Sequence, residues 1–93
     1  MMTDRGLVTR DYHDTCRADL LIVNLLGARD KSLGTITELA WAYDHRIPTV
    51  VVMEPTGTNP HEHPFLREMT SYRVDSIDRA IEVVKSVLGL RSF

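Results

Sequence analysis

Two uninterrupted apolar runs dominate the hydrophobic pattern of the chain. Residues 19–25 have the sequence DLLIVNL and residues 49–53 have the sequence TVVVM. A strand covered on one face alternates between apolar and polar positions, so a continuous run predicts a strand that is buried on both faces. A weaker third strand is predicted over residues 71–74.

The segments around these runs have the spacing of helices. Apolar side chains recur every three or four positions over residues 33–44, after Ser32 as a candidate N-cap, and over residues 76–88, before Gly89 as a terminator. The predicted helices are residues 10–18, 33–44, 64–69 and 76–88.

Strands that alternate with helices indicate an α/β fold with parallel strands. We expect residues 1–9 to form a loose polar arm and residues 10–90 to form a single domain. Ligands of such sheets bind beyond the carboxyl ends of the strands. The loops after Asn24 and Met53 are therefore the segments in which a site is expected.

Composition and charge narrow the range of functions. The 93 residues carry a net charge of −2, which argues against a partner that is a nucleic acid polymer. No apolar run approaches the roughly 20 residues that cross a bilayer, so no membrane partner is expected. A single cysteine cannot form an internal disulfide, which fits a cytoplasmic location.

The segment that begins the predicted second helix carries candidate chemistry. Ser32, Gly34 and Thr35 lie where free backbone N–H groups favour an oxyanion or a phosphate, and Glu38 follows on a largely apolar stretch. Glu38 is therefore a candidate nucleophile or base. The alternative is an ordinary capped helix, with Ser32 as the cap and Glu38 on the surface, and spacing alone favours that alternative.

Other polar residues give weaker signals. Asp11 could bind a sugar hydroxyl or a base edge, although an acidic residue near a helix start also fits the helix dipole. His61 and His63 are two residues apart in a proline-bounded loop, which is not the spacing of a helical metal site, so no metal is predicted. Hydrogen bonds that stabilise the loop, or a contact with a ligand or subunit, are the favoured roles for both histidines.

Taken together, these motifs resemble those of a known enzyme family. The segments RDYHD (residues 10–14), ADLLIVNL (18–25) and SLGTITELAWA (32–42) are similar to the nucleoside 2-deoxyribosyltransferases. They are also similar to the related enzymes that hydrolyse the N-glycosidic bond of nucleoside monophosphates. The segments PTVVVMEP (48–55) and NPHEHP (59–64) resemble a second block of that family.

The resemblance implies a flavodoxin-like parallel sheet, a homo-oligomer with shared sites, and a nucleoside or nucleoside monophosphate as the ligand. It implies that Glu38 attacks the anomeric carbon of the sugar and that Asp11 orients the base. Ser32 corresponds to a residue that holds the 5′-phosphate in the hydrolases, and Asn59 to one that reaches a neighbouring subunit's sugar. No metal or organic cofactor is needed for this chemistry.

The beginning of the chain departs from the family pattern. Family members start with a strand, a glycine-bearing loop, a helix and a second strand, and residues 1–10 match none of these. The chain is therefore expected to correspond to the last two-thirds of a family domain, with the strand over residues 19–25 at a sheet edge. The alternative functions are a non-catalytic nucleotide-binding module and an inactive, truncated α/β subunit.

Overall fold

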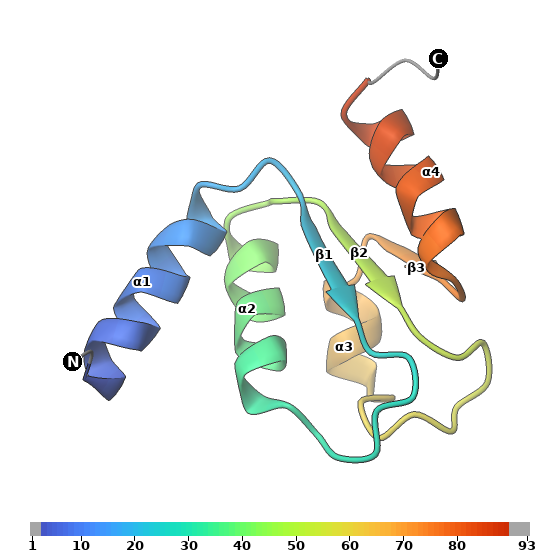
Figure 1. The fold of residues 1–93 in the computed structure, drawn as a ribbon, viewed down its shortest axis with the longest axis horizontal. Coiled ribbons are helices and arrows are strands. Elements are labelled where there is room, and N and C mark those ends of the chain that lie inside the picture. Colours follow the sequence, from blue (N-terminus) through green and yellow to red (C-terminus); the bar gives the residue numbers. More distant parts are fainter. Residues whose placement is uncertain (1–2, 90–93) are drawn as a thin grey trace.

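Three parallel strands form the centre of the protein, in the order β1-β2-β3 (Figure 1). The computed structural model describes residues 3–89. The strands are β1 (Leu21–Asn24), β2 (Thr49–Val52) and β3 (Tyr72–Val74). The helices are α1 (Asp4–Cys16), α2 (Leu33–Asp44), α3 (Pro64–Met69) and α4 (Ile77–Val87). The predicted α/β class with parallel strands is confirmed.

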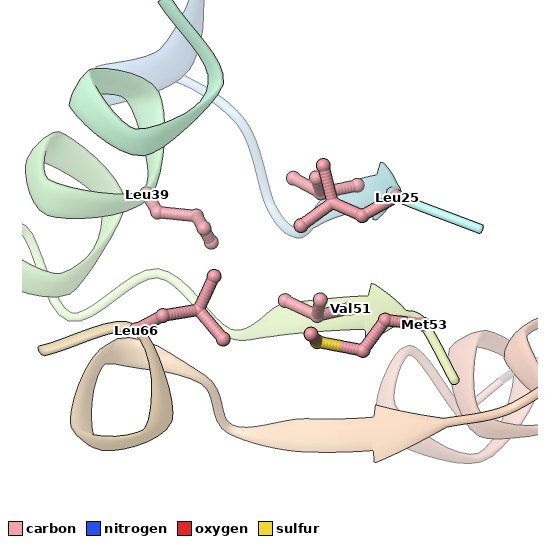
Figure 2. Packing of buried hydrophobic residues seen from close by; sticks show 6 residues of the cluster. Leu25, Leu39, Val51, Met53 and Leu66 are labelled. Carbon is pink, nitrogen blue, oxygen red and sulfur yellow. The ribbon is translucent and has the colours of Figure 1, made fainter. Parts of the chain in front are cut away.

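Helices cover both faces of the sheet. Leu39 from α2 and Leu66 from α3 pack against Val51, Met53 and Leu25 on one face, as Figure 2 shows. The opposite face, with Val50 and Val52, packs against α4, whose covering residues are Ala80, Val83 and Val84. The sheet and the helices that cover it therefore form three layers, with a separate apolar core on each side of the sheet.

The strands differ in burial because of their positions in the sheet. All four residues of β2, the central strand, are buried. The strand β1 lies at an edge, and its Ile22 is 48% exposed. The predicted position of this apolar run at the edge of the sheet is confirmed. Its continuous pattern also predicted burial on both faces, and for Ile22 that prediction is wrong.

Helix α1 begins earlier than the sequence pattern suggested. Its first residue is Asp4 rather than Arg10, and Thr3 caps it by accepting a hydrogen bond from Gly6 N–H at 3.0 Å. The expectation of a loose arm is thus wrong for residues 4–9. Residues 1, 2 and 90 of the predicted arm and domain lie outside the described residues.

The reason for this difference lies in what α1 packs against. It contacts α2 and lies on the far side of α2 from the sheet in Figure 1. The contact includes Tyr12 edge-on to Trp41, with ring centroids 5.1 Å apart. A helix that packs mainly on one other helix needs no wide apolar stripe, so the helical pattern was weak in the sequence.

The other helix boundaries follow from local chemistry. Helices α2 and α3 have the predicted bounds, and Ser32 caps α2 by accepting a hydrogen bond from Thr35 N–H. Gly89 follows α4 with a φ of 69°, which a residue with a side chain rarely adopts. Within residues 3–89, no helix is both long enough and apolar enough to cross a membrane.

Candidate functional site

A cleft of about 240 Å³ between α1 and α2 contains the two carboxylates singled out in the sequence. Asp11 comes from α1 and Glu38 from α2, and Gly34 lies in the same wall. The other residues that line the cleft are Val8, Leu33, Thr37 and Trp41. The structure therefore brings together three of the six predicted site residues.

Helical periodicity explains how α2 presents this wall. Gly34, Thr37, Glu38 and Trp41 are spaced i, i+3, i+4 and i+7, so they share one side of the helix. The opposite side of α2 carries Leu39 into the core beside the sheet. Packing of Leu39 thus fixes the direction in which Glu38 points.

The environment of Glu38 differs from that of an ordinary surface glutamate. Burial of the partly covered side chain raises the pKa of Glu38 above its usual value of 4.5, and the negative charge of Asp11 raises it further. Asp11 itself lies 3.5 Å from the guanidinium of Arg10. A pair of carboxylates with different environments in one cleft is typical of acid, base or nucleophilic chemistry.

Ser32 lies elsewhere. It lines a second, mostly apolar cavity of about 260 Å³ between the beginnings of α2 and α3, with Lys31 and His63 among its neighbours. Its hydroxyl donates to Thr35 Oγ1 at 2.9 Å, and it also accepts from Thr35 N–H at 3.3 Å. The structure thus gives Ser32 and Thr35 a clear role in capping α2, and it separates Ser32 from the cleft with Glu38.

Asn59 is buried and its side chain is fully hydrogen-bonded. The amide nitrogen donates to Leu25 O and to Glu54 Oε1, each at 2.8 Å. The amide oxygen accepts from the backbone N–H and from the ring Nδ1 of His61, each at 2.9 Å. An asparagine side chain has two donors and two acceptor positions, so no position is left for a sugar. The expected contact of Asn59 with a neighbouring subunit's substrate is therefore corrected to a structural role.

This network fixes the hydrogen-bonding state of His61. Because the Asn59 oxygen is an acceptor, His61 Nδ1 carries a proton, and Nε2 accepts from Ser32 N–H at 2.8 Å. His61 is 3% exposed and joins the Asn59 loop to the beginning of α2. The favoured role of a loop-stabilising histidine is confirmed for His61.

A second polar cluster, which was not apparent from the sequence, joins the same loop to β3. Glu62 binds Arg73 at 2.7 Å and Arg67 at 3.0 Å, and Arg73 also donates to Glu54 O. These contacts, first that with Arg73, lower the pKa of Glu62. Charged residues far apart in sequence give no periodic signal, so only the fold shows that they meet.

The structure adds no metal site to these features. Within residues 3–89, no three histidine, cysteine, aspartate or glutamate side chains are grouped so that they could hold a metal ion. Comparison with protein-family models, with curated proteins and with solved structures gives no match for this chain. The cleft between α1 and α2 is therefore the feature of the molecule that bears on its function.

Proposed function

We propose that the cleft between α1 and α2 cleaves the N-glycosidic bond of a nucleoside, a deoxynucleoside or the corresponding 5′-monophosphate. The observation that carries the proposal is the shared cleft of Asp11 and Glu38, with Trp41 beside them. Burial and a neighbouring negative charge make the Glu38 carboxylate less stable than one in water, which favours its reaction with a cationic centre.

The residues have distinct roles in the proposed reaction. A Glu38 oxygen attacks the anomeric carbon while the bond to the base breaks, and the bonding electrons leave with the base, which takes up a proton from water. Water then cleaves the sugar ester for hydrolysis, or a second base displaces Glu38 for transfer. Asp11 accepts a hydrogen bond from the leaving base, and Gly34 leaves room because open space surrounds its α-carbon.

The resemblance to the nucleoside 2-deoxyribosyltransferases supports the same assignment. On that view, β1, β2 and β3 correspond to the last three strands of a flavodoxin-like sheet in the order 2-1-3-4-5. The protein acts as a homo-oligomer, and no cofactor takes part in the reaction.

The test is release of free base from deoxynucleosides and their monophosphates, followed by chromatography. Glu38→Gln keeps the shape of the side chain and removes the nucleophile, so we expect at least about a thousandfold loss of rate. Glu82→Gln, an exposed substitution on α4, is the matched control and should have no effect. Equal rates for Glu38→Gln and the parent would refute the assignment.

The pH profile tests the second carboxylate. The nucleophile must be ionised, so the rate should fall as the pH falls through the raised pKa of Glu38. Asp11→Asn removes one cause of that rise, and the acid limb should move to lower pH. An acid limb that does not move would show that Asp11 does not act on Glu38.

A further inference from the structure

Among residues 3–89, no strand pairs with the outer edge of β1, so this edge carries unpaired backbone groups. Leu21 N–H donates to Pro48 O at 2.9 Å and Leu25 N–H donates to Val52 O at 2.8 Å, so the odd-numbered residues face β2. The N–H and C=O of a strand residue point to the same side. Those of Ile22 and Asn24 therefore point away from the sheet.

The side chains of β1 leave this edge accessible. Its four residues, LIVN, include no lysine or proline, which are the residues that commonly block an edge strand. Ile22 is partnered in register with Val50 and so lies on the face that α4 covers. Helix α4 packs on β2 and β3, and Ile22 remains 48% exposed.

We propose that two copies of the chain pair through their β1 edges, antiparallel about a twofold axis that passes beside Ile22. In this arrangement Ile22 exchanges two backbone hydrogen bonds with the partner subunit's Ile22. The two isoleucine side chains become neighbours on the same face and cover each other. The result is one continuous sheet with three strands from each copy.

Charge favours a second copy in this orientation. Asp14, Arg17 and Asp19 before β1 carry a net charge of −1, whereas Arg29, Asp30 and Lys31 in the loop after it carry a net charge of +1. An antiparallel arrangement brings the acidic beginning of each strand toward the basic end of the other, and the twofold axis repeats this match. A parallel arrangement would place like charges together.

The length of the strand sets the expected strength. Stable interfaces usually bury about 1,200–2,000 Å² in total, and pairing along four residues covers less than that. The dimer should therefore depend on concentration. Its formation does not depend on the chemistry proposed for Glu38.

Sedimentation equilibrium over a concentration series provides the first test. The parent chain of 10.6 kDa should approach twice that mass as its concentration rises. Ile22→Lys places a charge at the dyad and should weaken the dimer by at least about tenfold. Ile81→Lys is the matched control, because Ile81 is 47% exposed, much as Ile22 is, and belongs to helix α4 rather than to the paired strand.

Two further variants separate the interface from the stability of the fold. Ile22→Pro removes only the outward N–H, so it should abolish the dimer and leave the thermal unfolding of the monomer cooperative. In a Cys16→Ser background, Ile22→Cys should form a disulfide-linked dimer on oxidation, since hydrogen-bonded antiparallel partners have Cα atoms about 5.5 Å apart. Ile81→Cys should not.

Any one of the following three results would overturn the proposed dimer. A parent chain that stays monomeric through the millimolar range has no such interface. A dimer that survives Ile22→Lys with unchanged affinity is built elsewhere on the molecule. Equal cross-linking of Ile22→Cys and Ile81→Cys would show random collision rather than a defined dyad.

Discussion

Replacing Asn59 with alanine should remove the junction between the loops that follow β1 and β2. The side chain bonds Leu25 after β1, Glu54 after β2, and both the backbone and the ring of His61. His61 in turn binds the backbone of Ser32 at the beginning of α2. One truncation therefore affects three segments that meet at the carboxyl ends of the strands.

The magnitude follows from the groups left without partners. Two of them, the backbone N–H of His61 and its Nδ1–H, belong to a residue that is 3% exposed, whereas Leu25 O keeps the hydrogen bond from Ala28 N–H at 3.1 Å. Each unsatisfied buried group costs about 1–3 kcal/mol, and water entering the space left by the amide recovers part of this. We expect a loss of about 2–4 kcal/mol, against a total stability of roughly 5–14 kcal/mol for a chain of this length.

Urea unfolding, followed by the fluorescence of Trp41 and by circular dichroism, measures this loss. Asn24→Ala is the matched control, because the exposed Asn24 side chain accepts one hydrogen bond, from Leu26 N–H. It should cost less than about 1 kcal/mol. Similar losses for the two variants would refute the argument that buried, fully bonded amides dominate this region.

Two further predictions concern acid stability and backbone conformation. The hydrogen bond from Asn59 lowers the pKa of Glu54. The stability that the ionised Glu54 contributes is therefore present above the usual pKa of 4.5 and is lost as the pH falls through the lowered pKa. In urea unfolding at a series of pH values, Glu54→Gln should lose less stability on acidification than the parent. Gly27 has a φ of 72° in open space, so Gly27→Ala should cost about 1–2 kcal/mol. Gly34→Ala, within helix α2, should instead stabilise by about 0.5–1 kcal/mol, and thermal unfolding that shows the same sign for both would contradict this reasoning.

The candidate site was predictable to different degrees along the chain. Glu38 was identified because it follows a capped helix start beyond a buried strand, and the structure places it in a cleft with Asp11. Asn59 was assigned to a substrate by resemblance, but its burial and four hydrogen bonds make it structural. Hydrogen-bond satisfaction depends on the neighbours that a side chain meets in space, and a loop sequence does not specify them.

The sequence by itself determined the local elements of this protein. The apolar runs determined the two principal strands, and the caps and periodicity of α2 and α3 determined their bounds, because these signals act between residues that are close in the chain. Only the tertiary structure decided that α1 begins at Asp4, since that helix is stabilised by packing on α2 rather than by an apolar stripe. It also decided that Asp11 and Glu38 share one cleft while Ser32 lines another. Which residues share a cavity depends on how separate helices pack, and the sequence pattern of one segment does not specify the segments that it meets in space.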